Sequence, residues 1–545
     1  MTLALPDPTL AYWPADTTRE ILPMTAGEAL RQTAARMPHQ CALVEVVPEG
    51  GKTLTHAPET NRRWTYAALL AQSEQCAHWL LSRYRPGDPI CLWAPNVPEW
   101  VILQYGAALA GLVLVTANPA LRADELRYVL RQSRSVALLH VDEFRGSDMA
   151  AIAAEVADEV RETFSLARWG DEVLGHVPRS ELPVVAPGAP AQLQYTSGTT
   201  GRPKGALLRH SALLTNASFV TSRLQLGAGV LVSPMPLFHT AGSVMSVLGC
   251  VSHGATLVLP QFFEPETVLA AIQRERGTVL FGVPTMLIAM LEHPSAGTHD
   301  LSSLRFASSG GAPVPPELLK RIKTCFGCDL LSVYGQTEAS PIICQTAPDD
   351  SFEDKSETAG RPLWQVEVRI ADPVTGETQP VDVAGEIQAR GYQTMLGYYD
   401  MPEASAQTLG PDGWLRTGDL GTMDRRGYVR VTGRLKDMII RGGENIYPVE
   451  VEARLLAHPE VVDVAVFGLP DPTWGEVVCA AVRVRTPDGW PAAAQLRDFV
   501  RASLAPQKAP ARYFVCPAFP LTGSGKVQKF RLIEQVRAGS LAELS

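Results

Sequence analysis

The sequence has no apolar run long enough to cross a membrane. Its most apolar segment, 105–117, is shorter than the roughly 18 residues that a spanning helix needs, and glycines interrupt it. We expect this segment to form a buried helix followed by a buried strand. Residues 1–16 contain no basic region and are broken by prolines, so they are not expected to be a secretory signal.

A basic charge excess and a pattern of paired cysteines are also missing. The net charge is −9, which disfavours a general nucleic-acid-binding protein. The nine cysteines are odd in number and scattered, which predicts a protein of the reducing cytoplasm rather than a disulfide framework. Cys325 and Cys328 form a lone C-x-x-C pair without a second pair or nearby histidines, so a zinc site is not expected.

The length and the local patterns predict a protein of the α/β class with more than one domain. A chain of 545 residues is too long for a single hydrophobic core. Apolar strand patterns at 89–93 and 136–141 alternate with helical patterns, which indicates largely parallel sheets. Thr25 and Thr65 are expected to cap two early helices, and residues 207–221 are expected to be helical.

The most informative stretch is 195–205, which reads YTSGTTGRPKG. Hydroxyl side chains flank Gly198, whose backbone can approach a ligand closely, and such loops can wrap phosphate oxygens. Lys204 adds a compact positive charge. The spacing differs from the P-loop pattern G-x-x-x-x-G-K-[ST], because Pro203 stands where that pattern has glycine and Lys204 precedes Gly205. The alternative is a flexible Ser/Thr/Gly turn at the surface.

Further segments with chemical potential follow along the chain. Tyr334 can stack on adenine, Thr337 can bond to a phosphate, and Glu338 offers the hard oxygen that Mg²⁺ prefers. Asp419, expected at the end of a strand, can accept hydrogen bonds from both ribose hydroxyls. The segments are PLFHTAG at 236–242, ASSGGAP at 307–313, YGQTE at 334–338, GWLRTGD at 413–419, GRLKD at 433–437, RGGENIYP at 441–448 and TGSGK at 522–526.

In this order, the segments resemble the signature motifs of the adenylate-forming superfamily, and specifically its AMP-forming acyl-CoA synthetase branch. The superfamily also includes luciferases and the adenylation domains of peptide synthetases. The resemblance covers about 96–526. It implies a large N-terminal adenylate-forming domain of stacked α/β subdomains, residues 1–433. A small mobile α+β C-terminal domain, 434–545, is expected to follow, with a hinge near Lys436.

The resemblance also implies roles for individual residues. Glu338 is the expected Mg²⁺ ligand. Read alone, His239 would rather be a core histidine and Lys526 a solvated charge. For Asp419 the alternative is a turn aspartate before Gly421. The expected catalytic residues are Lys526, Thr337, Glu338 and His239. The expected ATP- and AMP-binding residues are Thr196, Ser197, Gly198, Thr199, Thr200, Lys204, Gly310, Gly311, Ala312, Tyr334, Gln336, Thr337, Asp419, Arg434 and Lys526. The expected acyl pocket comprises Phe238, His239, Gly335, Ala339 and Ser340, and the expected coenzyme A and hinge residues are Lys436, Gly442, Gly443 and Glu444.

Two positions in the predicted pocket bear on which carboxylic acid is the substrate. Peptide-synthetase domains usually place an aspartate beside the aromatic residue of the pocket, where this chain has His239. Because a buried ammonium would lack its partner, we expect a substrate without an α-amino group. Acetate-activating relatives have tryptophan where this chain has Gly335. The missing indole is expected to leave room for a medium-chain or aryl acid, each buried CH₂ contributing about 0.8 kcal/mol.

The expected reaction is therefore ATP-dependent activation of a carboxylic acid to an acyl adenylate, followed by transfer to coenzyme A. The implied cofactors and co-substrates are ATP, Mg²⁺ and coenzyme A. The expected partners are a small carboxylic acid and coenzyme A, with no nucleic acid and no membrane span. The oligomeric state stays open, with a homodimer as one option. Two alternatives remain: a ligase that loads a carrier-protein pantetheine, and a non-catalytic nucleotide-binding regulator.

Overall fold

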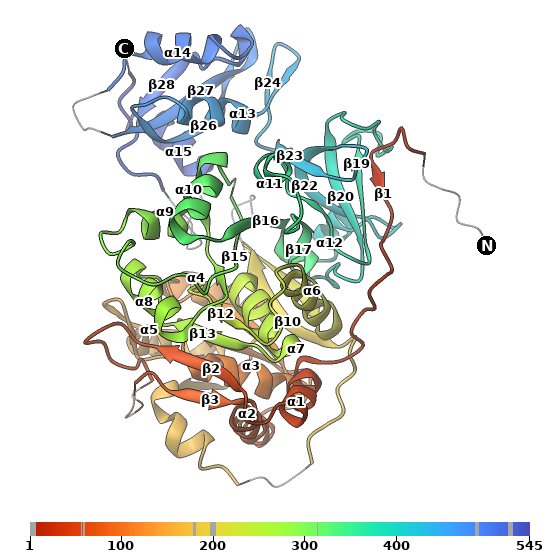
Figure 1. Cartoon of the computed structure of the whole chain (residues 1–545), viewed down its shortest axis with the longest axis vertical. Helices are drawn as coiled ribbons and strands as arrows, with labels where there is room; N and C mark the ends of the chain where they lie inside the picture. The colour runs from red at the N-terminus through yellow and green to blue at the C-terminus, as the bar shows by residue number, and fades with distance from the viewer. Residues whose placement is uncertain are drawn as a thin grey trace.

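Four large sheets organise the chain, three in its N-terminal part and one in its C-terminal part (Figure 1). The structure is a computed structural model that describes residues 7–55, 57, 60–177, 181–196, 203–312, 314–485, 490–520 and 527–544. The predicted α/β class is confirmed: most strands of the two largest sheets are parallel, and helices pack against them.

The two largest sheets contain most of the strands of the N-terminal part. In spatial order, the seven-stranded sheet consists of β21 (Gly397–Tyr398), β11 (Lys204–Arg209), β10 (Pro190–Thr196), β5 (Val113–Ala117), β4 (Pro89–Trp93), β6 (Ala137–His140) and β9 (Glu162–Ser165). The nine-stranded sheet consists of β18 (Arg361–Pro362), β17 (Ile342–Gln345), β16 (Asp329–Gly335), β15 (Phe306–Gly310), β14 (Val279–Phe281), β12 (Val230–Val232), β13 (Thr256–Pro260), β2 (Cys41–Val46) and β3 (Arg63–Thr65).

Two smaller sheets follow, and the chain passes from one to the other at the predicted hinge. The first is antiparallel, with β1 (Tyr12–Trp13), β19 (Val366–Ala371), β20 (Gly385–Gly391), β22 (Leu415–Met423) and β23 (Val429–Arg434). The C-terminal sheet contains β25 (Glu444–Ile446), β24 (Ile439–Arg441), β27 (Gly475–Val484), β26 (Val461–Asp471) and β28 (Arg512–Val515). A short hairpin joins β7 (Glu143–Phe144) to β8 (Ser147–Asp148).

The helix α3 (Pro98–Ala110) lies at the centre of the N-terminal part. All 13 of its residues are buried, and it contacts α1, α2, β5 and the π-helix η4. This confirms the buried helix and strand expected for 105–117. Thr25 and Thr65 cap α1 and α2 through their side chains, as predicted. The helices of this part are α1 (Ala26–Arg36), α2 (Tyr66–Leu81), α3, α4 (Ala123–Ser133), α5 (Met149–Glu155), α6 (His210–Arg223), α7 (Gly249–His253), α8 (Pro265–Glu275), α9 (Pro284–Glu292), α10 (Pro316–Phe326), α11 (Phe352–Glu357), α12 (Pro402–Thr408), η1 (Ala157–Glu159), η2 (Leu166–Arg168), η3 (Trp169–Val173), η4 (Ala241–Leu248) and η5 (Thr337–Ala339).

The C-terminal part has hydrophobic cores of its own. Their buried members all lie between Ile439 and Leu532, around helices α13 (Pro448–Leu456), α14 (Ala493–Arg501) and α15 (Lys529–Arg537), with η6 (Pro506–Lys508) on a connection. In Figure 1 this part, drawn in blue, sits at one end of the molecule. The sheets change between Arg434 and Ile439, a segment that includes Lys436. The exact position of the hinge within this segment stays a prediction.

One expected element differs from the structure. Residues 207–221 were predicted to be helical, but 204–209 form β11 and the helix begins at His210. The reason is tertiary: β11 pairs antiparallel with β10 on one side and with β21 on the other. Two neighbouring strands therefore take Leu207 and Leu208 into the sheet, although their local sequence continues the helical pattern.

Within the described ranges, no helix is long and apolar enough to cross a membrane. All nine cysteines are free thiols.

Candidate active site

The predicted phosphate loop connects two central strands of the seven-stranded sheet. β10 runs parallel to β5 and antiparallel to β11, and Thr196 pairs with Lys204 where the hairpin opens. Thr196 donates a hydrogen bond from Oγ1 to the Lys204 carbonyl at 3.3 Å. Four predicted loop residues, Ser197, Gly198, Thr199 and Thr200, lie outside the described residues, as does Lys526. The two strand ends nevertheless fix where the loop begins and ends.

Lys204 and Glu338 both contact one tyrosine, Tyr398. Tyr398 donates a hydrogen bond from its hydroxyl to Glu338 Oε1 at 2.6 Å. The Lys204 Nζ lies 5.0 Å from the centre of the same ring, within the range of a cation–π contact. Burial, followed by the Glu338 carboxylate, raises the pKa of the Tyr398 phenol. Tyr398 therefore remains a donor, and it links the predicted metal ligand to the predicted phosphate-binding lysine.

A second polar cluster joins the nine-stranded sheet to the neighbouring antiparallel sheet. Tyr334 on β16 donates from its hydroxyl to Asp419 Oδ2 at 3.0 Å, and Arg434 Nε lies 3.1 Å from Asp419 Oδ1. Asp419 and Arg434 are register partners on β22 and β23. Burial, then the Asp419 charge, raises the pKa of the Tyr334 phenol. Asp419 lies inside β22 rather than at a strand end as expected, and the ladder is irregular after the next residue.

Lys436 belongs electrostatically to the same cluster, although it lies beyond the last strand of the N-terminal part. Burial, then the charge of Arg434, lowers the pKa of its ammonium, and Lys204 acts in the same direction. Lys204 of the predicted phosphate loop and Lys436 of the predicted hinge are therefore near enough to repel one another in this arrangement.

The predicted adenine contacts follow the end of β15. Gly310 is the last residue of this strand and pairs with Val333, the residue before Tyr334. Gly311 and Ala312 follow it and are exposed, while Pro313 lies outside the described residues. The exposed backbone and the Tyr334 ring therefore come from neighbouring strands, as an adenine site between them would require.

The loop before η4 holds the two residues of the predicted acyl wall. Gln194 on β10 donates from its side chain to the Phe238 carbonyl at 2.6 Å. Asn96 accepts from the Leu237 amide at 2.8 Å and donates to the Met235 carbonyl at 3.1 Å. His239 is half-buried, and its Nδ1 accepts from the Ala241 amide at 3.2 Å. The loop is thus tied to the strand that leads into the phosphate loop.

At Gly335 the structure gives a second reason for glycine. β17 pairs antiparallel with β16 there with an irregular register, and a Cβ at Gly335 would lie 2.0 Å from the Pro341 carbonyl oxygen. Ala339 and Ser340 follow in η5 and its C-cap, both fully buried. Gly335 therefore permits a close approach of the backbone at Pro341. A Gly335→Trp variant would strain this close approach, so it is not a clean test of pocket size.

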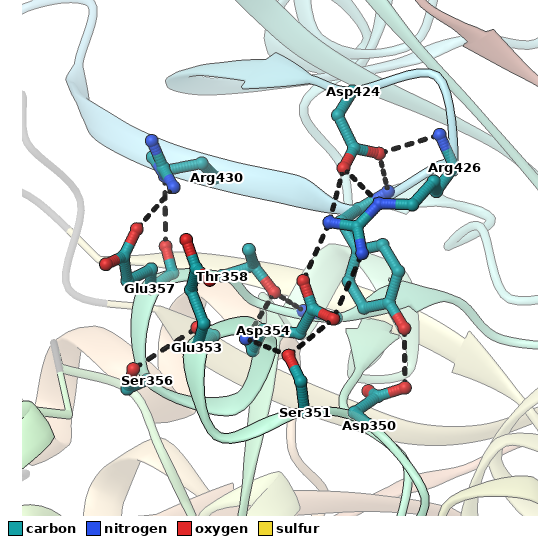
Figure 2. A network of polar contacts seen from close by, with 12 residues as sticks. Asp350, Ser351, Glu353, Asp354, Ser356, Glu357, Thr358, Asp424, Arg426 and Arg430 are labelled. Atoms are coloured by element: carbon teal, nitrogen blue, oxygen red, sulfur yellow. Dashed lines mark hydrogen bonds and ion pairs between the residues drawn. The ribbon is translucent and has the colours of Figure 1, made fainter.

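A polar network holds the β22–β23 hairpin that carries Asp419 and Arg434 (Figure 2). Arg426 in the hairpin turn donates to both carboxylate oxygens of Asp354 on α11, at 2.7 and 3.1 Å. Its Nε also donates to Asp424 at 2.9 Å, while Arg430 pairs with Glu357 at 2.7 Å. The network lines an open polar pocket of about 90 Å³. It anchors the hairpin to the helix that follows β17.

The predicted thiol-tunnel turn is the tip of the β24–β25 hairpin. Gly442 and Gly443 have φ values of +60° and +85°, which glycine adopts without strain. The Gly442 amide donates to the Trp474 carbonyl at 2.8 Å. Glu444, at the start of β25, accepts from Gln507 Nε2 at 2.8 Å. The turn belongs to the C-terminal sheet, and a close approach of a thioester arm to its two glycines stays a prediction.

The Glu338 carboxylate fits the role of a Mg²⁺ ligand. Glu338 Oε1 accepts from Tyr398, and Oε2 has no hydrogen bond or ion pair to another described residue. Within the described ranges no group of three His, Cys, Asp or Glu side chains could hold a metal. One carboxylate oxygen is what Mg²⁺ takes from a protein when nucleotide phosphates and waters supply its other ligands.

The structure thus joins most predicted positions through contacts of neighbouring elements. Phe238 contacts β10, β10 leads to Lys204, and Lys204 lies over Tyr398, which bonds to Glu338. Thr337 and Gln336 separate Glu338 from the Tyr334–Asp419 pair. The sequence reasoning missed the roles of Tyr398, Gln194 and Asn96. Gly397–Tyr398 was interpreted only as a strand, and no local signal indicated which side chain it would meet.

Comparison with known proteins finds matches over most of the chain. A family model described as AMP-binding enzyme matches residues 30–399, and one described as the AMP-binding enzyme C-terminal domain matches 450–526. YngI of Bacillus subtilis (strain 168), named provisionally as an acyl-CoA synthetase, is 38% identical over 554 residues, covering 95% of this chain and 98% of that protein. The medium-chain acyl-CoA ligase ACSF2 of Mus musculus, named as mitochondrial, is 35% identical over 573 residues, covering 98% and 91%.

A solved structure with the same fold contains the intermediate that the motifs suggest. It is the o-succinylbenzoate CoA synthetase MenE of Bacillus subtilis in complex with the acyl-adenylate OSB-AMP. Its TM-score is 0.80 at 31% identity, and the alignment covers 94% of this chain and 98% of that one. From the family models and the near-complete relatives, the chain belongs to the AMP-binding enzymes, on the branch of the acyl-CoA synthetases and ligases.

Proposed function

We propose that this protein uses ATP to convert a medium-chain fatty or aryl carboxylic acid into an acyl adenylate and then transfers the acyl group to coenzyme A. The products are acyl-CoA, AMP and pyrophosphate. The observation that carries the proposal is the pair of polar clusters joined by YGQTE. Lys204, Tyr398 and Glu338 meet at one end of this segment, and Tyr334, Asp419 and Arg434 meet at the other.

The two clusters suit the two ends of ATP. At the Asp419 end, a carboxylate oriented by Tyr334 and Arg434 would accept from the ribose hydroxyls. At the Glu338 end, Lys204 and the hydroxyls of Thr196 and Thr337 would bind the phosphates. Mg²⁺ bound by Glu338 would neutralise phosphate charge. The carboxylate of the acid can itself attack the α-phosphorus, so the protein need only position the reactants and stabilise charge.

The substrate class rests on the acyl wall and on the relatives. Phe238 offers an aromatic face, and His239 stands where an amino-acid-activating enzyme would place an aspartate. Mus musculus ACSF2, which aligns over nearly the whole chain, is named a medium-chain acyl-CoA ligase. Gly335 no longer supports the preference by itself, because the close approach of the Pro341 backbone already requires glycine there.

An acid screen tests the proposal. Purified protein is given MgATP and an acid panel from acetate to dodecanoate, with benzoate and amino acids included, and pyrophosphate release is followed with and without coenzyme A. We expect release with medium-chain or aryl acids that exceeds release with acetate or amino acids, and an acyl-CoA product by mass spectrometry. A preference for acetate would refute the substrate class, and no acid-dependent release would refute the activity and favour a nucleotide-binding regulator.

The acceptor needs a separate comparison. The Gly442–Gly443 turn would accommodate a pantetheine arm from free coenzyme A or from a carrier protein. Parallel reactions with coenzyme A and with a holo acyl carrier protein should give acyl-CoA and little acylated carrier. The reverse ratio would support the carrier-loading alternative. The free thiols fit a reducing compartment such as the cytoplasm.

A further inference from the structure

Tyr398 occupies a position between the two groups that would face the phosphates and their metal ion. Its hydroxyl donates to Glu338 Oε1 at 2.6 Å, and the Lys204 ammonium lies 5.0 Å from its ring centre. Within the described residues, Lys204 forms no ion pair with a carboxylate, Glu338 included. The tyrosine therefore separates two opposite charges that both lie at the predicted phosphate site.

The backbone around Tyr398 is held on both sides. Met395, three residues earlier, donates from its amide to the Glu338 carbonyl at 2.9 Å. Ser405 on α12 accepts from the Tyr398 amide at 2.8 Å. β21 pairs with β11, the strand that Lys204 opens. The ring is thus positioned by β11, which also carries Lys204, and by the backbone bond between Met395 and Glu338.

Building on the proposed function, we propose that Tyr398 is a positioning residue that prepares Glu338 to bind Mg²⁺ and Lys204 to bind phosphate. The hydroxyl bonds to one oxygen of Glu338, Oε1, and leaves the other, Oε2, available to bind Mg²⁺. The ring face keeps the Lys204 ammonium beside Glu338 without letting the two charges pair. Without the tyrosine, an Lys204–Glu338 ion pair would compete with the incoming nucleotide and its cation.

Two substitutions separate the two contacts of Tyr398. Tyr398→Phe removes the hydroxyl and keeps the ring, whereas Tyr398→Leu removes both. The matched control is Tyr399→Phe, because Tyr399 is also half-buried and its hydroxyl makes no hydrogen bond within the described residues. Thermal unfolding of all three variants checks that each is folded. The binding of ATP is then measured by calorimetry with and without Mg²⁺, so the readout does not depend on turnover.

The expected results differ between metal-free and metal-bound nucleotide. Tyr398→Phe should raise the Kd of MgATP by about tenfold, the ratio typical of one hydrogen bond to a charged group, and leave the Kd of metal-free ATP unchanged. Tyr398→Leu should also raise the Kd of metal-free ATP, by about threefold, as expected for the loss of a partly exposed cation–π contact. The half-saturating Mg²⁺ concentration for pyrophosphate release should rise in parallel in both variants.

A double-substitution cycle tests whether Tyr398 acts through Glu338. In a Glu338→Gln background, adding Tyr398→Phe should leave the Kd of MgATP unchanged, because the interaction it removes no longer orients a metal ligand. Three results would each overturn the inference. The effects of Tyr398→Phe and Glu338→Gln on the Kd of MgATP could be additive, or Tyr398→Phe could leave the ratio of the MgATP Kd to the metal-free ATP Kd unchanged. The control Tyr399→Phe could also change that ratio as much as Tyr398→Phe does. If no acid supports pyrophosphate release, the proposed function fails, but the calorimetric ratio still decides the role of Tyr398.

Discussion

At the scale of single residues, His210 is buried, and its ring makes no hydrogen bond with the described residues that would offset the cost of burial. It is 2% exposed at the start of α6, and neither ring nitrogen has a partner within the described residues. Burial lowers the pKa of its imidazole from 6.5 to about 4. The unfolded chain therefore binds a proton on His210 more readily than the folded protein does.

The stability of the protein should accordingly fall as the pH falls from about 6.5 to about 4, and His210 should contribute about 3 kcal/mol of that loss. His210→Leu should flatten this part of the pH profile and leave stability at pH 7 unchanged or slightly higher, because an apolar side chain needs no partner. Thermal unfolding from pH 4 to 7 measures both effects. His39→Leu, at an exposed position, should not change the slope, and an unchanged slope in His210→Leu would contradict the prediction.

At the scale of elements, the hairpin of β22 and β23 depends on a clamp to α11 (Figure 2). The Arg426 side-chain hydrogen bonds hold the pKa of the Asp354 carboxyl below its ordinary value of 3.8. The stabilisation from this pair is present above that value and is lost as the pH falls through the lowered pKa. Because the same hairpin carries Asp419 and Arg434, the clamp should affect nucleotide binding as well as stability.

Arg426→Ala should lower stability only slightly, since Arg426 is largely exposed and its pairs are screened by water. It should also raise the KM for ATP more than it lowers kcat, because the clamp positions Asp419 without contacting the reacting atoms. Arg430→Ala removes the more exposed pair with Glu357 and serves as the control. Equal effects of the two variants on KM would show that the clamp does not position the site.

At the scale of the whole molecule, the C-terminal part has its own cores and is joined to the rest at 435–438. The Lys436 amide makes no backbone hydrogen bond within the described residues, so proline there should restrict rotation without unfolding this arrangement. If rotation separates the two half-reactions, Lys436→Pro should keep acyl-adenylate formation and slow thioester formation.

Lys526→Ala should give the opposite result. Loss of one preorganised charge should slow adenylate formation by about 10²–10³-fold while a supplied acyl adenylate is still converted to thioester. The two half-reactions are measured separately, by pyrophosphate release and by thioester formation from synthetic acyl adenylate. Equal loss of both in Lys526→Ala would contradict rotation.

By itself, the sequence determined the α/β class, the helix caps at Thr25 and Thr65, and the motif order that identifies the family. These properties depend on local chemistry: side-chain caps, apolar periodicity, and glycine or hydroxyl residues at fixed spacing. Only the tertiary structure decided that residues 204–209 form a strand, because two neighbouring strands outweigh the local helical pattern. It also brought the Pro341 backbone close to Gly335 and placed Tyr398 in contact with both Lys204 and Glu338. Those three residues are widely separated in the sequence, and only the pairing of β21 with β11 beside η5 brings them together.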